Sequence, residues 1–432
     1  MKKRLISLIL CVCMLISCLA VMSSCEIEDD RREREEEDTR GTRQESETDK
    51  KPRPSVEYKK NESFEEAQMY FALNLFKESV YRRENDASVM ISPLSVMAAL
   101  AMTANGARGE TLEDMETVLG GLDITELNAA LSNYIDSLPS TDRSKLNIAN
   151  SIWMRDSESL QVKETFLEKM LEYYSAQLNR EAFDYSTVSR INKWVRENTD
   201  GMIDKIVERI SPLAMMYLIN AVCFDAKWAE QYQDHQVSDG EFTNVNGDVK
   251  KVKMLNSDEY RYIEYGDGAG FVKSYEDGYS FVALLPSEGT SIYDYINSME
   301  SEGLKHALDN PSYETVITAM PEFSFEYEVD MKDILISLGM DSAFEGQGAD
   351  FTDMATCSDG DLAIGSVLHK TYIEVTQSGT RAAAVTSVEM NCESAPMPPE
   401  KEVILDRPFV YMIVDNGTNL PIFIGAVTEI GE

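Results

Sequence analysis

The sequence has few residues of the kinds that carry enzymatic or metal chemistry in recognisable patterns. It contains only 3 histidines, and their positions, His235, His306 and His369, match no metal-ligand spacing. The GxSxG, HExxH and GxxxxGKS/T motifs do not occur, and Gly266–Phe271 is a glycine-rich turn rather than a dinucleotide fingerprint. Pairs of carboxylates carry little information among 76 acidic residues. The sequence therefore favours a protein that is not an enzyme and needs no cofactor or metal.

Cysteine is also scarce in the part of the chain expected to fold. Of the 7 cysteines, only Cys223, Cys357 and Cys392 lie beyond the first 25 residues. They are widely separated, and no CxxC pair occurs, so neither a disulfide framework nor a zinc site is expected. The fold must therefore be stabilised by packing.

Basic residues are a minority. Lysine and arginine number 40 against 76 acidic residues, which gives a formal net charge of -36. Nucleic acids, other polyanions and anionic lipid surfaces all require a basic patch, so none of them is an expected partner. The hydrophobic fraction of 43% is that of a chain with a large buried core.

The N-terminus has the pattern of an export signal. A basic start, Lys2–Arg4, is followed by the apolar stretch Leu5–Met22 and by small residues. The letters VMSSC resemble a bacterial lipobox, which predicts a signal peptide over residues 1–24 and lipid attachment at Cys25. LISC, ending at Cys18, is a competing match, and a plain secretory signal is the alternative. We expect a cell-surface lipoprotein whose only membrane contact is this lipid.

The next segment is charged and almost without apolar residues. Residues 26–53 contain dense acidic and basic side chains that cannot bury enough surface to offset the entropy of ordering. We predict a disordered tether over residues 25–60. Folding is expected to begin near residue 61.

The rest of the chain predicts an α+β protein built around antiparallel sheets. Its strongest local signals are a helix from Phe64, a second helix capped by Ser92 with Pro93 first and Asn105-Gly106 as its stop, and a terminal hairpin around Asn416-Gly417. Two further segments read as strands, and the second is expected to be covered on both faces: 146–154 and 215–224.

Four ordered blocks of sequence then resemble the serpin family. They are ISPLSVMAALAMTANGARGET (91–111), LINAVCFDAKW (218–228), VLHKTYIEVTQSGTRAAA (367–384) and RPFVYMIVDNGTNLPIFIGAV (407–427). The resemblance extends from Ser63 to Ile430. It implies one serpin domain over residues 61–432, with about eight to nine helices, three β-sheets and an exposed reactive-centre loop at about 378–400.

The resemblance also implies a function. A serpin offers its loop to a serine protease, which cleaves it and forms an acyl-enzyme. The cleaved loop then inserts as a strand into the largest sheet before the ester is hydrolysed, and the distorted protease is trapped. We expect a bacterial, monomeric, irreversible inhibitor of this kind. The alternatives are a non-inhibitory serpin that acts as a binding protein, and an inhibitor of cysteine proteases.

The hinge of the loop can be tested against strand geometry. Side chains of a strand alternate between faces, so if Thr380 points inward, Ala382 and Ala384 do too, while Arg381 and Ala383 face solvent. Gly379 precedes this run. The resemblance implies that residues 379–384 form the hinge, together with Gln377.

Two hinge residues depart from the family pattern. Gln377 stands where the family's acid is expected, and Arg381 follows the threonine. Arg381 falls on the solvent face and should be tolerated. Gln377 gives up a charge-assisted interaction at the top of the sheet, which predicts a sheet that opens more easily.

Counting from the hinge predicts the cleaved bond. The family spacing from Gly379 leads to Glu393 and Ser394, and the alternatives are Met390, Cys392 and Met397. A glutamate before the cleaved bond favours glutamyl-specific or elastase-like proteases, whereas the acidic pocket of a trypsin-like enzyme should reject it.

Further residues match the family's shutter and breach, the regions through which the sheet opens. The shutter matches are Ser92, Ser95, Asn220 and His369, and Trp228 matches the tryptophan at the top of the sheet. Taken singly, these are an N-cap, a helix serine, a buried asparagine, a buried histidine and a core aromatic. Their role is expected to be conformational.

Overall fold

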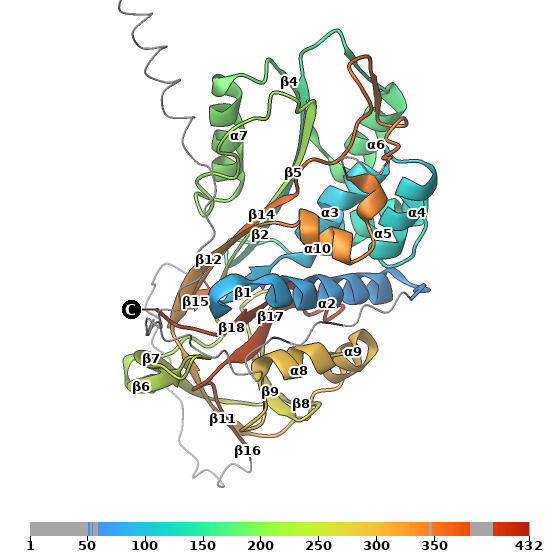
Figure 1. Cartoon of the computed structure of the whole chain (residues 1–432). Coiled ribbons are helices and arrows are strands. Elements are labelled where there is room, and N and C mark those ends of the chain that lie inside the picture. The colour runs from blue at the N-terminus through green and yellow to red at the C-terminus, as the bar shows by residue number, and fades with distance from the viewer. Residues whose placement is uncertain (1–50, 52–53, 55–58, 345–347, 381–400, 432) are drawn as a thin grey trace, which may run out of the picture. The chain divides into compact units, whose positions relative to one another are not determined.

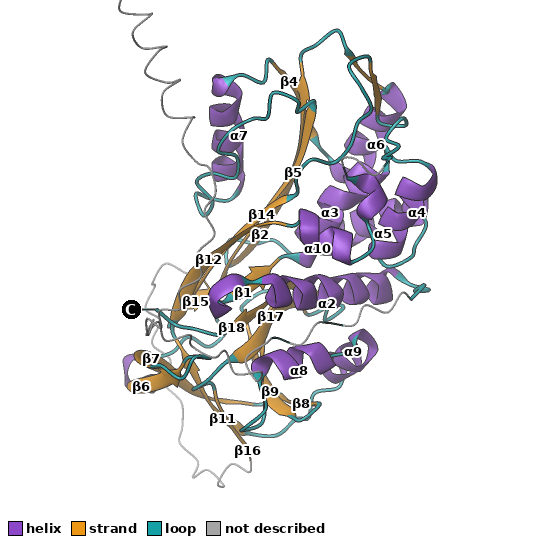
Figure 2. Ribbon diagram, in the orientation of Figure 1, coloured by secondary structure: helices purple, strands orange, loops and turns teal. Residues whose placement is uncertain are grey.

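The computed structural model describes residues 51, 54, 59–344, 348–380 and 401–431. These residues form packed helices and β-sheets, which confirms the predicted α+β class (Figures 1 and 2). Within these ranges no helix has the length and apolarity to cross a bilayer. The described chain contains nine α-helices: α2 (Phe64–Arg82), α3 (Pro93–Ala104), α4 (Gly109–Val118), α5 (Ile124–Ser137), α6 (Glu164–Tyr174), α7 (Tyr185–Asn198), α8 (Ile292–Ser298), α9 (Ser301–Asp309) and α10 (Lys332–Ser337).

The described strands form three large sheets and a two-stranded one. The main sheet has the order β12 (Phe323–Asp330), β14 (Leu368–Thr376), β15 (Gly379–Thr380), β5 (Met216–Lys227), β2 (Ser144–Arg155) and β4 (Gln177–Glu181). The second sheet has the order β1 (Val89–Ile91), β18 (Pro421–Val427), β17 (Phe409–Asp415), β10 (Tyr279–Leu285), β9 (Gly268–Ser274) and β8 (Tyr262–Tyr265). The third has β16 (Lys401–Ile404), β11 (Val316–Pro321), β7 (Val249–Glu259) and β6 (Val237–Thr243), and the small sheet pairs β13 (Ala355–Cys357) with β3 (Leu160–Val162).

Helix α3 begins and ends where its sequence predicts. The Ser92 hydroxyl accepts a hydrogen bond from the Ser95 N–H at 3.3 Å, and Pro93 occupies the first helical position, where a missing N–H costs nothing. Asn105 closes the helix, and its N–H donates to Ala101. Local chemistry therefore fixes both ends of the helix beneath the main sheet.

The predicted C-terminal hairpin is also confirmed. Every residue of β17 and β18 is buried, and the turn is held by Asp415, whose carboxylate accepts the Gly417 N–H at 2.7 Å. The hydroxyl of Tyr134 lies 3.2 Å from the other Asp415 oxygen, and burial raises the pKa of Tyr134 above its usual range. The tyrosine therefore remains a neutral donor.

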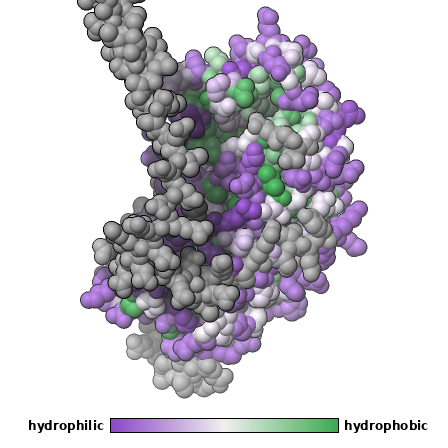
Figure 3. Space-filling view, viewed as in Figure 1, coloured by the Kyte–Doolittle hydropathy of each residue, from purple (hydrophilic) through white to green (hydrophobic). Residues whose placement is uncertain are grey.

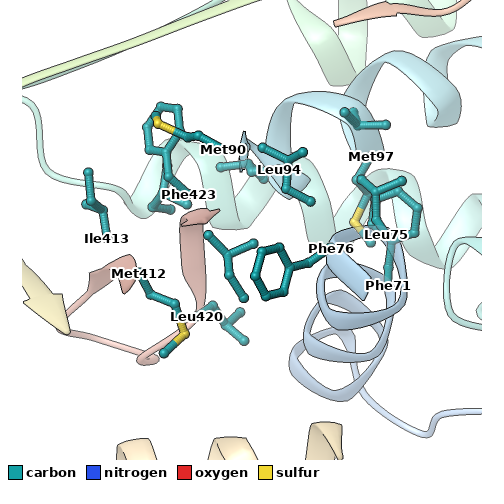
Figure 4. Close-up of a cluster of buried hydrophobic side chains, with 14 of the residues drawn as sticks. Phe71, Leu75, Phe76, Met90, Leu94, Met97, Met412, Ile413, Leu420 and Phe423 are labelled. Atoms are coloured by element: carbon teal, nitrogen blue, oxygen red, sulfur yellow. The ribbon is translucent and has the colours of Figure 1, made fainter. Parts of the chain in front are cut away.

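The hairpin packs against α2 and α3 in the principal core. The contacting side chains come from segments that lie far apart in the sequence, as a close-up shows (Figure 4). Figure 4 labels Phe71, Leu75, Phe76, Met90, Leu94, Met97, Met412, Ile413, Leu420 and Phe423.

Strand β5 differs from its prediction in one respect. The apolar run from Met215 to Phe224 predicts a strand covered on both faces, and its second half, from Ala221, is buried in that way. Met216, Tyr217 and Leu218 are only half-buried. Among the described strands, β14 does not pair with β5, and these apolar residues line a cavity beside β5.

Lys51 contacts the folded domain although it falls within the expected tether. Its ammonium donates to the Arg83 carbonyl at 2.5 Å and lies 3.2 Å from the Asp86 carboxylate. Arg83 is the C-cap of α2, where the helix dipole favours a cation. The same ammonium lies 4.9 Å from the centre of the Tyr293 ring.

Candidate functional site

The described part of the main sheet holds a short strand between β5 and β14. Within the described residues this strand, β15, has two residues, and it pairs on one side with β14 and on the other with β5. Thr380 lies opposite Val375 and Ala226, and both pairings are antiparallel. Among the described strands, β5 and β14 have no pairing with each other. We call the gap between them, beyond β15, the slot.

An apolar cavity of about 730 Å³ occupies this region. Its lining includes Leu218, Asn220 and Val222 of β5, Val367 and His369 next to or within β14, and Ala99 of α3 below. In the space-filling view, hydrophobic side chains gather in a hollow in the upper half of this face (Figure 3). The slot therefore has the size and the apolar lining to accept an extended peptide segment.

Gly379 is required by the close approach of β5. A Cβ atom at this position would lie 2.2 Å from the Ala226 carbonyl oxygen and 2.8 Å from the Lys227 Cα. Both are backbone atoms, so any side chain would push β15 out of the sheet. Close contact with the β5 backbone therefore explains why the hinge has a glycine at this position.

Thr380 points inward, which meets the condition on which the predicted faces of the hinge depend. Its side chain is 3% exposed, and its hydroxyl forms a hydrogen bond with the hydroxyl of Tyr275. Tyr275 is buried and stacks on Trp228, with ring centres 4.4 Å apart. Burial raises the pKa of Tyr275 above its usual range, so its hydroxyl stays neutral. The start of the hinge is therefore already packed into the sheet.

Trp228 holds the turn that precedes β15. Its indole N–H donates to the Thr376 carbonyl at 2.9 Å, and its backbone N–H donates to the Ser378 carbonyl at 3.1 Å. The Tyr232 N–H donates to the Gln377 carbonyl at 3.1 Å. The tryptophan lies at the end of β5, beside the hinge.

Gln377 lies between two carboxylates. Its backbone N–H donates to Glu322 Oε1 at 3.1 Å, and its side-chain Nε2 donates to Asp234 Oδ1 at 3.1 Å. Sequence reasoning identified neither acid, because each comes from a distant part of the chain. An acidic side chain at position 377 would repel both of them, so the amide is the better match to these surroundings.

The four shutter matches meet beneath the slot. The Ser92 hydroxyl donates to the Ile422 carbonyl at 2.9 Å, and the Ser92 N–H donates to His369 Nε2 at 3.2 Å. The Ser95 hydroxyl donates to the side-chain oxygen of Asn220. Burial lowers the pKa of His369 to about 4, so the imidazole is neutral at pH 7 and can accept this bond.

The polar cluster extends further than the sequence indicates. The Asn220 amide donates to Asn150 Oδ1 at 2.8 Å, and the Asn150 amide donates to the Tyr174 carbonyl at 2.9 Å. Nothing in the sequence around Asn150 distinguishes it from other strand asparagines. A connected polar network thus links β5 and β2 of the main sheet to the end of α6.

The remaining predicted site residues lie outside the described residues. They are Cys25, Arg381, Ala382, Ala383, Ala384, Met390, Cys392, Glu393, Ser394 and Met397. The described chain leaves the main sheet at Thr380 and returns at Lys401, where β16 runs parallel to β11 in the third sheet. Segment 381–400 therefore connects two different sheets.

Comparisons with known proteins agree with this arrangement. Residues 66–430 match the family described as serpin (serine protease inhibitor). An uncharacterized serpin-like protein of Thermococcus kodakarensis is 31% identical over 385 residues, which cover 86% of this chain and 88% of that protein. The native state of the thermophilic serpin tengpin is 44% identical with a TM-score of 0.81, covering 88% of this chain and 97% of that one. Its latent state is 43% identical with a TM-score of 0.76, covering 87% and 100%. The chain therefore belongs to the serpin family, whose members are generally protease inhibitors rather than enzymes.

Proposed function

We propose that this protein is an irreversible inhibitor of serine endopeptidases that traps them by inserting its cleaved loop into the slot. The observation that carries the proposal is β15, which places Gly379 and Thr380 between β5 and β14 with an apolar cavity beyond them. Cleavage within segment 381–400 frees the chain after Thr380 from β16. The freed segment can then continue the strand that β15 begins.

The pairing of β15 predicts where the next inward residues would lie. In the same register, Ala382 falls opposite Phe224 and Ile373, both of which are buried. A small side chain suits this position, because the cavity beside Thr380 has a volume of only about 10 Å³. The alanines of the hinge therefore fit the narrow end of the slot.

Further along the same face, the register reaches the polar cluster. Thr386 falls opposite Asn220 and His369, which both line the slot. A threonine hydroxyl can form a hydrogen bond with either side chain. The inserted strand would therefore cover the polar cluster and still offer its side chains a hydrogen-bond partner. Insertion adds main-chain hydrogen bonds on both sides, each with a net value of roughly 0.5–1.5 kcal/mol.

The proposed cleaved bond is Glu393–Ser394, with Met390, Cys392 and Met397 as alternative positions. An acidic residue before the bond favours glutamyl-specific or elastase-like proteases and disfavours trypsin-like ones. Glu393 lies thirteen positions after Thr380, and a strand rises about 3.3 Å per residue, so the cleaved segment is long enough to span a sheet.

We propose further that the mature protein is a bacterial surface lipoprotein. The support is the N-terminal pattern, in which Cys25 ends a lipobox and an apolar stretch precedes it. The lipid would hold the molecule at the outer face of a membrane, and the charged segment after it would let the inhibitor reach soluble proteases. We expect the inhibitor to act as a monomer.

The test is to mix the mature chain with a glutamyl-specific and an elastase-like serine endopeptidase and to separate the products under denaturing conditions. Trapping predicts a covalent complex that survives the denaturant. A cleaved chain with free, active protease would identify a non-inhibitory member of the family instead. Cleavage without a rise in melting temperature would contradict insertion as well.

A further inference from the structure

A lysine and a glutamate are buried together where the second and third sheets meet. Lys273 lies on β9 of the second sheet, and its ammonium is 2.7 Å from Oε1 of Glu259, the last residue of β7 in the third sheet. The side chains of Lys273 and Glu259 are only 4% and 13% exposed. Removing two charges from water is costly, so this pair is a weak source of stability and a candidate for a more specific role.

Two aromatic rings at the end of the main sheet complete the surroundings of the ammonium. It lies 4.3 Å from the centre of the Tyr232 ring and 5.7 Å from the centre of the Trp228 ring. Both residues are buried, and burial raises the pKa of Tyr232 above its usual range, so its ring is a neutral phenol. A cation at these distances attracts the faces of both rings.

The carboxylate that holds the ammonium is itself fixed in the third sheet. The Ser257 hydroxyl donates to Glu259 Oε1 at 2.8 Å, and the same hydroxyl lies 3.0 Å from that of Thr318 on β11. Glu259 also lies opposite Val316 of β11 in the strand ladder. The third sheet therefore determines where the Lys273 ammonium lies.

The two rings belong to the residues that hold the turn before β15. Trp228 donates its indole N–H to the Thr376 carbonyl and its backbone N–H to the Ser378 carbonyl, and the Tyr232 N–H donates to the Gln377 carbonyl. All three donors come from residues that the buried ammonium contacts. The place of β15 between β5 and β14 therefore depends on where these rings lie.

We propose that Lys273 is a positioning residue of the inhibitory reaction. Held by Glu259, it keeps Trp228 and Tyr232 in place, and these two residues fix the turn from which the inserting strand continues. The proposal rests on the loop insertion proposed above and deepens it. A turn that leaves its place would let β15 separate from its neighbours, which slows insertion relative to hydrolysis of the acyl-enzyme. Lys273 is buried, so it acts through the rings and not by contact with the protease.

A second buried lysine provides a matched control for loss of general stability. Lys77 of α2 is 8% exposed, and its ammonium donates to the Met299 carbonyl at the end of α8. Neither residue lines the cavity of the slot. A methionine at position 77 or 273 removes a buried ammonium and keeps a long side chain, so both substitutions should lower the melting temperature by several degrees.

The experiment compares the mature wild-type chain with Lys273→Met, Glu259→Gln, the double variant and Lys77→Met. The first readout is hydrogen exchange at the backbone N–H groups of residues 228 and 232, measured by mass spectrometry of the peptide that contains them. Lys273→Met should speed this exchange about tenfold, because it loses a buried cation–π contact that opposes local opening. Lys77→Met should leave the exchange there unchanged.

The second readout is the number of chains cleaved per protease trapped, with a glutamyl-specific and an elastase-like endopeptidase as probes. Lys273→Met should raise this number roughly threefold to tenfold, and Lys77→Met should not change it. Glu259→Gln keeps an oxygen that can accept from the ammonium, so it should act in the same direction but less. The double variant has no unpaired buried charge and should recover part of its melting temperature, while both readouts stay altered.

The outcomes separate positioning from stability and from the inhibitory mechanism. Wild-type exchange at residues 228 and 232 in Lys273→Met would refute the positioning role, and so would equal effects in Lys77→Met. A double variant that recovers both readouts together with its melting temperature would show that the pair acts through stability alone. If Lys273→Met does not fold, Glu259→Gln and the double variant decide the question. If wild type traps no protease, insertion is refuted as the reaction, and the exchange comparison still decides whether Lys273 holds the turn.

Discussion

Replacing Thr380 by arginine should convert the protein from an inhibitor into a substrate. The Thr380 side chain is 3% exposed and bonds to the Tyr275 hydroxyl. The cavity beside it has a volume of about 10 Å³, roughly one water molecule, so an arginine side chain has no space there. Thr380 is packed into the sheet before cleavage, so the substitution affects both states.

The two states should respond by different amounts. Before cleavage, the hinge can leave the sheet, and the main loss is the buried Tyr275 hydroxyl without its partner, which costs about 1–3 kcal/mol. During insertion, by contrast, the arginine would have to be buried, and burying an unpaired charge costs several kcal/mol. At 1.36 kcal/mol per tenfold in rate, insertion should slow by roughly a hundredfold or more. Hydrolysis of the acyl-enzyme would then be faster than insertion of the loop.

The assay is the yield of denaturant-resistant complex, measured alongside the melting temperature of the uncleaved chain. Thr380→Ser retains the hydroxyl and a small side chain, and should still trap protease. Thr380→Arg should be cleaved at the same bond with almost no complex, while the uncleaved chain melts only a few degrees lower. A Thr380→Arg variant that traps protease normally would refute the inward register of the hinge and, with it, the argument for the slot.

Three further predictions concern the surroundings of the slot. Gln377→Glu should lower the free energy of unfolding by about 1 kcal/mol at low salt, because the new carboxylate repels Glu322 and Asp234, and added salt should restore it; a more stable variant in thermal melting would contradict this. The pKa of His369 is about 4 when folded against an ordinary value of 6.5, so its contribution to stability is full above pH 6.5 and is lost as pH falls toward 4. Wild type should therefore lose about 3 kcal/mol more than His369→Gln between pH 7 and pH 4 in urea denaturation, and parallel curves would exclude this role. Lys51→Ala should lower the free energy of unfolding by about 1 kcal/mol in the same assay, because it removes the cation at the end of α2. An unchanged urea midpoint would show that the contact does not stabilise the domain.

The elements that could be predicted are those set by neighbouring residues. Ser92, Pro93 and Asn105 determine the ends of α3 by capping chemistry, and the terminal hairpin follows from two apolar runs around a short turn. These features need only a few residues of sequence, so tertiary context did not alter them. Strand alternation relates the faces of neighbouring hinge residues, whereas the inward direction of Thr380 is a finding of the structure.

The features that could not be predicted depend on residues brought together by the fold. Glu322 and Asp234 decide what suits position 377, yet they lie 55 and 143 residues away from it. The half-buried end of β5 has the same origin, because an apolar run does not reveal which strands pair with it and where a cavity lies beside it. Asn150 joins the polar cluster only through the pairing of β2 with β5.

The most direct test of the central claim is mass spectrometry of an equimolar mixture of the mature chain and a glutamyl-specific serine protease after denaturation. β17 and β18 are buried throughout, so the C-terminal fragment should stay bound until the fold is disrupted. Trapping predicts one covalent species with the mass of the protease plus the mature chain through Glu393, and a released peptide that begins at Ser394. Free protease beside two separate fragments of the chain would contradict the account.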